Sequence, residues 1–430
     1  MTPIAPSEGR PPAAEATPAR SRRTRRALDW FVFFVADIQT GFGPFVAVYL
    51  TSQKWTQTDI GLVLTAAGLI TLVIQVPCGA LVDSLRSLRT AAAIAVSAIG
   101  GAAFALAAWP VFPVVLVSRL AHAAGSCVLG PAIATMSLNF AGPTRVSSRL
   151  GRNASFASIG TGLAAAGMAA CGYYLSSQAV FFVAAALVAP ALLALTQIRG
   201  DEVDTSRAAT AHSSMSLREI LSGLRLLLRD RALMVFAACM VMFQLANAAM
   251  LPLAASMVTL RSSSAATIMV GAAVVVPQLI VAALSPIVGL KAQTWGRRPL
   301  LVIGFAALPL RALLFAVIVN PNLLVLAQML DGVSATVLGV LVPLTMADVT
   351  RRTGHFNLAQ GAIGCAVGIG ASISTTLAGK LTDLYGSYSA FVAMGLVAAA
   401  AVVVVLLFMP ETRPEEPEAE TSPESSPHKA

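Results

Sequence analysis

Twelve apolar segments follow one another along this chain, and each is separated from the next by a short polar stretch. A helix of about twenty apolar residues crosses the ~30 Å hydrocarbon core of a bilayer. Inside lipid every backbone N–H and C=O group needs an internal partner, and segments of this length find those partners as α-helices. The sequence therefore predicts an all-α membrane protein with twelve transmembrane helices, at roughly residues 28–50, 59–82, 91–109, 111–139, 153–176, 178–197, 232–258, 265–290, 299–319, 322–347, 357–379 and 388–409.

The distribution of Lys and Arg predicts the orientation of these helices. Of the 29 basic residues, 24 lie in segments on the same side of the membrane as the N-terminus, and three lie on the other side. The remaining two, Arg119 and Arg311, lie within spans. Because basic residues stay on the cytoplasmic side, we expect a multi-pass protein of the cytoplasmic (inner) membrane with both termini in the cytoplasm. The net charge of +9 then reflects topology, so the expected partner is the lipid bilayer and not a nucleic acid.

A polar segment at residues 198–231 divides the twelve spans into two sets of six. Matching residue positions recur in the second half 208 to 210 residues after the first, for the pairs Pro44 and Pro252, His122 and Asp331, and Gly79 and Gly289. This near-constant offset indicates a duplicated six-helix unit. We therefore predict two six-helix bundles at 28–197 and 232–409, a cytoplasmic linker at 198–231, and disordered cytoplasmic tails at 1–27 and 410–430.

The loop after the eighth span contains a phrase that is repeated in weaker form after the second span. It runs from Gly289 to Arg298, has Gln293 at its centre and ends in Gly296, Arg297 and Arg298. The first-half copy has Arg86 where the second glycine is expected, and keeps Gly79, Leu81 and Asp83. Both copies resemble the loop signature Gly-x-Leu-x-Asp-x-x-Gly-Arg-Arg of the major facilitator superfamily, and the resemblance covers about residues 28–409. It implies a transporter in which two bundles rock about a site near the bilayer midplane.

The fourth span resembles a phrase of proton-coupled members of the same superfamily. Arg119 and Gly125 match its first and last residues, and His122 stands at the position of a glutamine. Charged groups are costly within a bilayer, so those that occur there are candidates for function. Asp37 lies nine residues into the first span and is the first candidate for a proton carrier. The alternative is that Asp37 only forms a buried ion pair with Arg119, and the two roles are compatible.

Further polar residues extend this candidate site. We expect Arg311 and Asp331 to lie at the same depth in the membrane and to form an ion pair. Asp331 is also a candidate for a direct role in transport. The resemblance implies that spans one, four, seven and ten line a central cavity. The candidate proton-coupling residues are Asp37, Arg119 and His122, and the candidate substrate-binding residues are Gln39, Phe42, Gln75, Gln244, Asn247, Gln278, Gln328 and Asp331. Each amide could instead join one helix to another.

A gate is expected at the cytoplasmic ends of the spans. A carboxylate such as Asp83 can bind a cation or a helix N-terminus in one conformation and lose that partner in the other. The candidate gating residues are Gly79, Asp83, Arg86, Gly289, Gly296, Arg297 and Arg298.

These features favour a monomeric secondary transporter of a small organic solute over an enzyme. The sequence has no nucleotide-binding loop and no metal-ligand spacing, so we expect no cofactor and a proton gradient as the energy source. Proton-coupled efflux is the first hypothesis. Proton-coupled uptake of an organic metabolite is the alternative, in which Arg119 or Arg311 would bind a carboxylate. A hypothesis from another class is a membrane sensor that binds its ligand without moving it.

Overall fold

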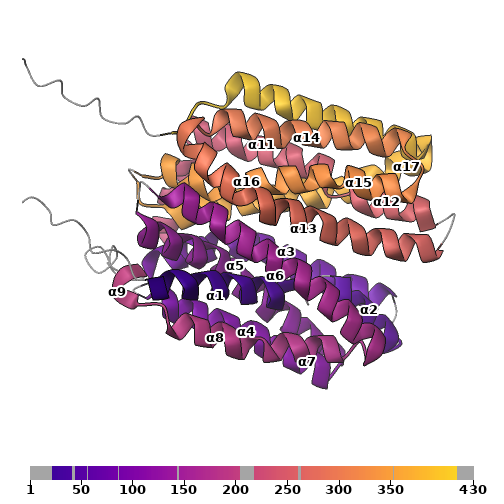
Figure 1. The fold of residues 1–430 in the computed structure, drawn as a ribbon, viewed down its shortest axis with the longest axis horizontal. Helices are drawn as coiled ribbons and strands as arrows, with labels where there is room; N and C mark the ends of the chain where they lie inside the picture. The colour runs from indigo at the N-terminus through magenta and orange to yellow at the C-terminus, as the bar shows by residue number, and fades with distance from the viewer. Residues whose placement is uncertain are drawn as a thin grey trace, which may run out of the picture.

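The computed structural model describes residues 22–413 except 41–43, 56, 86, 143–144, 204–216, 260–262 and 352. The described residues form α-helices joined by short connections (Figure 1). Their bounds are α1 Arg22–Thr40, α2 Pro44–Ser52, α3 Gln57–Ser84, α4 Leu88–Ala108, α5 Phe112–Ala141, α6 Val146–Tyr174, α7 Ala179–Ala186, α8 Val188–Thr196, α9 Gly200–Val203, α10 Leu217–Leu227, α11 Arg231–Asn247, α12 Met250–Thr259, α13 Ser263–Thr294, α14 Arg298–Val317, α15 Pro321–Ala327, α16 Met329–Val349 and α17 Phe356–Phe408.

The helices gather into two bundles that lie side by side (Figure 1). Helices α1 to α8 pack around one apolar core, whose buried residues run from Ala27 to Val203. Helices α11 to α17 pack around a second core, which takes nearly all its buried residues from Leu227 to Met409. The fold predicted from the apolar segments and from the repeat is thus confirmed.

The helices of the described residues can be matched to the twelve predicted crossings of a membrane. Within the described residues, ten helical stretches are long and apolar enough to cross. One of these is α17, whose 53 residues contain Gly386 with φ 81° and ψ 165°. A continuous helix of that length would measure ~80 Å, so Gly386, whose left-handed φ favours glycine, divides α17 into two crossings. The first crossing is made by α1 and α2, which are separate helices on either side of residues 41–43.

The structure differs from the predicted boundaries of both tails and adds two helices to the linker. Helix α1 begins at Arg22 and not at residue 28, because a helix continues past its apolar run into the interface, where arginine is a good helix former. The linker at 198–231 contains α9 and α10 and ends where Arg231 begins α11. The C-terminal tail is held at Glu411, which binds backbone N–H groups. The rest of both predicted tails lies outside the described residues.

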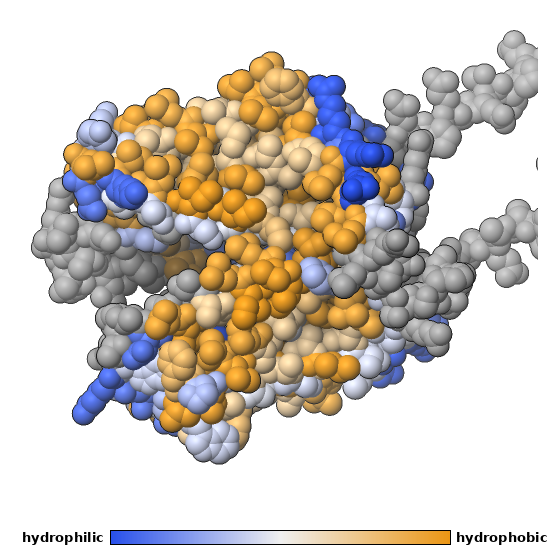
Figure 2. Space-filling view, turned by 180° about the vertical axis from the view of Figure 1, so that it is seen from behind, coloured by the Kyte–Doolittle hydropathy of each residue, from blue (hydrophilic) through white to orange (hydrophobic). Residues whose placement is uncertain are grey.

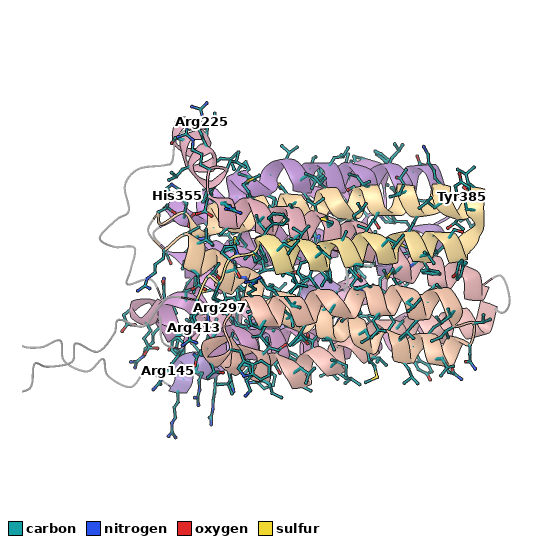
Figure 3. The ribbon with its side chains drawn as sticks, turned by 90° about the horizontal axis from the view of Figure 1, so that it is seen from above. Arg145, Arg225, Arg297, His355, Tyr385 and Arg413 are labelled. Carbon is teal, nitrogen blue, oxygen red and sulfur yellow. The ribbon has the colours of Figure 1, made fainter. Side chains whose placement is uncertain are left out.

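The surface of the molecule matches a membrane-spanning orientation. Hydrophobic residues cover the middle of both bundles, and hydrophilic residues concentrate toward the ends (Figure 2). Arg145, Arg225, Arg297 and Arg413 lie at one end of the bundles, and Tyr385 lies at the other (Figure 3). The end with the four arginines is termed the basic end below.

Candidate functional site

The two bundles meet closely along α3 and α17 near the basic end. Gly79 of α3 lies against the backbone carbonyl of Asn357 in the first turn of α17, so closely that a side chain at position 79 would overlap it. Glycine is therefore required here for the two helices to approach. This contact is termed the α3–α17 seam.

Asp83 binds the N-terminus of α17 at this seam. Its Oδ1 accepts hydrogen bonds from the Nδ2 and backbone N–H of Asn357 at 2.6 and 3.3 Å, and its Oδ2 accepts one from the N–H of Leu358 at 3.0 Å. A carboxylate at a helix N-terminus satisfies free N–H groups and complements the helix dipole. Of the two partners expected for Asp83, a cation or a helix N-terminus, the second is thus present, on the other bundle. Arg86 lies outside the described residues.

The second copy of the phrase meets the first bundle through α13 and α6. A Cβ on Gly289 would come within 2.5 Å of the Ser147 carbonyl oxygen, and a Cβ on Gly151 would come closer still to the Ser285 carbonyl oxygen. The first turn of α6 has no side-chain hydrogen bond from its N-cap residue, Arg145. This contact, termed the α6–α13 seam, resembles the first seam in its glycines, but Gln293 stands where the first copy has a carboxylate.

Three other candidate gating residues stabilise the second bundle internally. Gly296 has φ 89°, a conformation that favours glycine. The Nε of Arg297 donates to Asp348 Oδ2 in α16 at 2.9 Å, and Arg298 donates to the carbonyl of Leu406 in α17. In the described part of the chain these contacts stay within α13 to α17, so they do not cross between the bundles.

Glu411 binds the backbone of this loop, and it was not among the residues predicted from the sequence. Its carboxylate accepts hydrogen bonds from the N–H groups of Arg297 at 2.8 Å, Arg298 at 3.1 Å and Arg413 at 2.9 Å. Burial opposes ionisation of Glu411, but the three N–H donors and the charge of Arg297 outweigh it, and the pKa of Glu411 lies below its usual value. One feature of the sequence could have pointed to Glu411: it directly follows the last span, on the side of the membrane where the Gly-Arg-Arg loop is also expected.

Two acidic residues of α1 face α6. Asp29, which is 2% exposed, forms ion pairs with Arg149 at 2.7 Å and Arg152 at 2.6 Å. Asp37 lies eight residues later and is 5% exposed, and a Cβ on Gly160 would come within 2.9 Å of its Oδ1. Arg152 and Gly160 are also eight residues apart, so α1 and α6 run parallel in matching register. The sequence analysis missed the buried ion pairs of Asp29.

The buried ion pair expected between Asp37 and Arg119 is not formed in the described part of the chain. Helix α1 packs mainly along α6. Because of this packing, Asp37 faces Gly160 of α6 and not α5. The Oδ1 atom of Asp37 has no hydrogen-bond partner among the described residues. On α5, His122 lies 3.5 Å from the hydroxyl of Ser126, and Arg119 and His122 share one helix face by their spacing.

The expected ion pair between Arg311 and Asp331 is present. Arg311 is 2% exposed, and its guanidinium donates to Asp331 Oδ1 and to Asn247 Oδ1. It also lies over the ring of Phe315, 5.8 Å from its centroid. Arg311 thus connects α14 to α16 and to α11, and it brings the candidates Asn247 and Asp331 together.

A crevice of about 490 Å³ lies between the bundles and contains one predicted residue, Gln75. It is lined by α3 of the first bundle and by α11, α16 and α17 of the second. Gln360 of α17 also lines it, and its Nε2 is buried with no hydrogen-bond partner among the described residues. The sequence analysis missed Gln360, although an amide within an apolar span was the same signal that pointed to Gln75.

The other predicted amides are dispersed. Gln244 lies against Gly370 between α11 and α17, and Gln278 of α13 faces Gly162 of α6. Gln328 is 2% exposed between α15 and α16, and Gln39 is half-buried near the end of α1. Phe42 lies outside the described residues.

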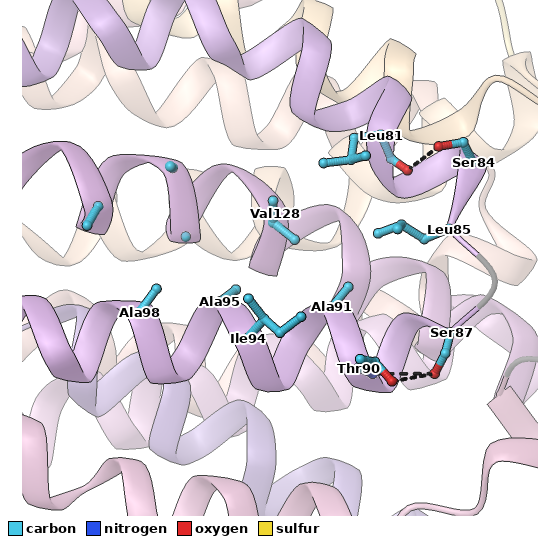
Figure 4. Close-up of a pocket in the computed structure, with 13 residues that line it drawn as sticks. Leu81, Ser84, Leu85, Ser87, Thr90, Ala91, Ile94, Ala95, Ala98 and Val128 are labelled. Carbon is cyan, nitrogen blue, oxygen red and sulfur yellow. Dashed lines mark hydrogen bonds between the residues drawn. The ribbon is translucent and has the colours of Figure 1, made fainter. Parts of the chain in front are cut away.

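A larger groove of about 690 Å³ lies within one bundle, between α3, α4 and α5 (Figure 4). Its lining is mostly Leu, Ile, Val and Ala side chains. The hydroxyls at its mouth bond locally, from Ser84 to the Leu81 carbonyl at 2.8 Å and from Thr90 to Ser87 at 3.2 Å. Because one bundle alone lines this groove, it is not part of a path between the two halves.

Comparison with known proteins places these features in a family. The family model described as Major Facilitator Superfamily matches residues 30–275 and 243–429. An uncharacterized MFS-type transporter of Mycobacterium tuberculosis (strain H37Rv) is 35% identical over 395 residues, which cover 91% of this chain and 94% of the relative. Multidrug resistance protein 1 of Bacillus subtilis (strain 168) is 30% identical over 144 residues, 33% of this chain and 36% of that protein.

Two solved structures share the fold. The E. coli fucose:proton symporter superposes with a TM-score of 0.69 at 16% identity, covering 88% of this chain and 97% of that one. The human organic anion transporter MFSD10 superposes with a TM-score of 0.62 at 14% identity, covering 89% and 99%.

Proposed function

Because the chain belongs to the major facilitator superfamily, and is thus a multi-pass membrane transporter and not an enzyme, we propose that it exports a small organic solute in exchange for protons. It does so as a monomer in the cytoplasmic membrane, by alternating access between its two bundles. The basic end faces the cytoplasm, in agreement with the positive-inside rule.

The buried carboxyl group of Asp37 is the observation that carries this proposal. It lies within a span, its Oδ1 has no hydrogen-bond partner among the described residues, and none of the described ion pairs includes it. An ionised carboxylate without a counter-ion is far more costly to bury than a neutral one. Asp37 therefore holds a proton in this conformation and releases it when a conformational change brings water or a cation to it.

In this conformation the two bundles are held together on the cytoplasmic side, as an outward-facing state of the cycle requires. Both seams lie near the basic end, where glycine contacts and Asp83 hold the bundles together. The crevice residues Gly68 to Gln75 lie eight to fifteen residues from Asp83 along α3, which is ~12 to 22 Å at 1.5 Å per residue. The space between the bundles is therefore on the outer side of the closed contact.

Roles for the remaining residues follow from their positions. Gln75 and Gln360 offer amide groups to a solute in the crevice, while Arg119 and His122 on α5 stay candidates for proton coupling in a conformation in which α1 and α5 meet. Asp83 keeps the cytoplasmic side closed by its bonds to α17. Arg311 is already neutralised by Asp331, which leaves it a weaker candidate for binding a substrate carboxylate.

Efflux is favoured over uptake by the partial similarity to the protein named Multidrug resistance protein 1. Uptake remains the second candidate because the fold is shared with a fucose:proton symporter. Inside-out and right-side-out vesicles loaded with a pH-sensitive dye separate the two. Export predicts that solute enters inside-out vesicles as protons leave them. Solute accumulation in right-side-out vesicles on an inward proton gradient would refute export. Binding of the solute without flux would indicate a membrane sensor that binds its ligand without moving it.

A further inference from the structure

Helix α10, in the segment between the bundles, has three distinct sides. Gly223 and Leu227 are buried where the helix meets the second bundle. Leu221 and Leu228 are 64% and 53% exposed. At about 100° per residue, Leu221 and Leu224 lie on the same side of α10. Leu228 lies in the turn after α10 and continues that side, because its N–H bonds to the Leu224 carbonyl at 2.8 Å, so the three form an apolar stripe.

A basic side adjoins this stripe. Arg225 is exposed on α10, about 40° around the helix from Leu221, and Arg229 is exposed in the turn that follows α10. Arg225 projects beyond the outline of the bundles at the basic end (Figure 3). An amphipathic helix with leucines on one face and arginines on the adjoining face is typical of helices that lie in a membrane interface.

The contacts of α10 place it at the level where the spans enter the membrane. A Cβ on Gly223 would come within 3.0 Å of the His355 ring and of Leu358 Cδ2. His355 is the N-cap residue of α17, and Arg231 begins α11 only four residues after α10 ends. Both α17, which α10 contacts at the N-cap residue and in the first turn, and α11 begin at this level, so α10 is held beside the lipid head groups.

We propose that α10 docks onto acidic phospholipids of the cytoplasmic leaflet. Leu221 and Leu228 insert at the boundary of the acyl chains, and Arg225 and Arg229 bind the phosphates. The position of α10 at the cytoplasmic ends of the spans and its positive charge both favour acidic phospholipids as the partner. The cytoplasmic leaflet carries the acidic lipids that attract basic segments next to a span.

Docking of α10 has a consequence for the gate. Leu358, whose side chain lies against Gly223, also donates its backbone N–H to Asp83. Lipid binding at α10 therefore steadies the α3–α17 seam. This consequence rests on the proposed function, whereas the docking itself does not.

Quenching of tryptophan fluorescence by lipids brominated near the head group tests the docking in vesicles containing the full chain. Leu228→Trp reports on the stripe. Leu226→Trp is the matched control, because Leu226 is 50% exposed but lies about 160° away around the helix. After subtraction of the wild-type signal, the tryptophan at position 228 should be strongly quenched and that at 226 weakly. No quenching at 228, or equal quenching at both positions, would overturn the docking.

Charge reversal tests the identity of the lipid. In the Leu228→Trp background, Arg225→Glu with Arg229→Glu should lower the quenching in vesicles with acidic lipids to its level in zwitterionic vesicles. Quenching that is the same in both lipids before and after the charge reversal would rule out acidic head groups. Neither measurement depends on transport, so failure here leaves the proposed function standing and loss of transport leaves the docking standing.

Discussion

The Oδ1 atom of Asp37 in α1 lies against Gly160 in α6, at a point where a Cβ would come within 2.9 Å of it. The carboxyl group thus occupies space that exists because residue 160 has no side chain. The two helices run parallel here, and eight residues nearer the basic end the same pair of helices is joined by Asp29 and Arg152.

Replacement of Asp37 should separate transport from folding. Asp37→Asn keeps the size of the side chain and removes its titratable proton, so we expect loss of proton-driven flux with an unchanged midpoint of thermal unfolding. Flux in proteoliposomes with an imposed proton gradient measures this. Asp383→Asn, which changes an exposed carboxylate, serves as the control. Full activity of Asp37→Asn would remove this residue from the coupling mechanism.

Gly160→Ala should disturb the contact between α1 and α6. The added methyl would come within 2.6 Å of the Phe33 carbonyl oxygen and 2.9 Å of Asp37, and overpacking of this kind costs about 1–3 kcal/mol. We expect a lower unfolding midpoint and slower transport. Gly167→Ala in the same helix is the matched control, because a Cβ there meets no atom within 4 Å. Equal effects of the two substitutions would argue against a specific role for position 160.

Asp83→Ala should weaken the α3–α17 seam. It removes the hydrogen bonds to Asn357 and Leu358, and the loss of a capping carboxylate costs about 1 kcal/mol. This shifts the population toward a conformation that is open at the basic end. Spin labels on the two bundles at that end measure the shift as a longer distance distribution. An unchanged distribution would show that the seam does not depend on the carboxylate.

Glu411→Gln should reveal a pH-dependent contribution to stability. The pKa of Glu411 is lowered in the folded protein, so its stabilisation is present above its unfolded pKa of about 4.3. It is lost as the pH falls through the lower, folded value. The wild type should therefore unfold at a higher temperature than the variant at pH 7, and the difference should shrink below about pH 4. A constant difference across this range would indicate a contribution that does not depend on ionisation.

Arg311→Met should destabilise the second bundle by leaving Asp331 and Asn247 without their donor. Removing one partner of a fully buried pair costs about 3–5 kcal/mol. The cost here should be smaller, because the Asp331 side chain is 28% exposed. The double variant Arg311→Met with Asp331→Asn should recover part of the lost stability, as measured by thermal unfolding in detergent. An additive loss in the double variant would contradict the pairing.

The sequence was sufficient to predict the spans because the bilayer imposes the length and apolarity of each crossing. For Asp83 it predicted a cation or a helix N-terminus as the partner, since the repeated loop phrase set the position of that carboxylate at the end of a span, and the structure shows the second of these. It did not predict the partner of Asp37. Depth in the membrane follows from counting residues, but the rotation of α1 about its axis is set by packing against Gly160.

Composition was a poor guide at the C-terminus. The Pro/Glu/Ser-rich tail lacks the apolar residues that would order it, yet Glu411 is held by three backbone N–H groups. Capping of this kind needs one carboxylate in the right place and little burial. Gln360 is a different case, because an amide within an apolar span was visible in the sequence there just as it was at Gln75.

The two seams between the bundles differ in one charge. Glycine contacts join the halves at both, but among the residues that the structure describes a carboxylate bonds across the bundles at α3 and α17 and not at α6 and α13. A neutralised or displaced Asp83 would release that side alone, while the opposite side kept its full set of contacts. The two bundles would then rotate about an axis along α6 and α13, where they stay in contact. The cytoplasmic opening would form first between α3 and α17.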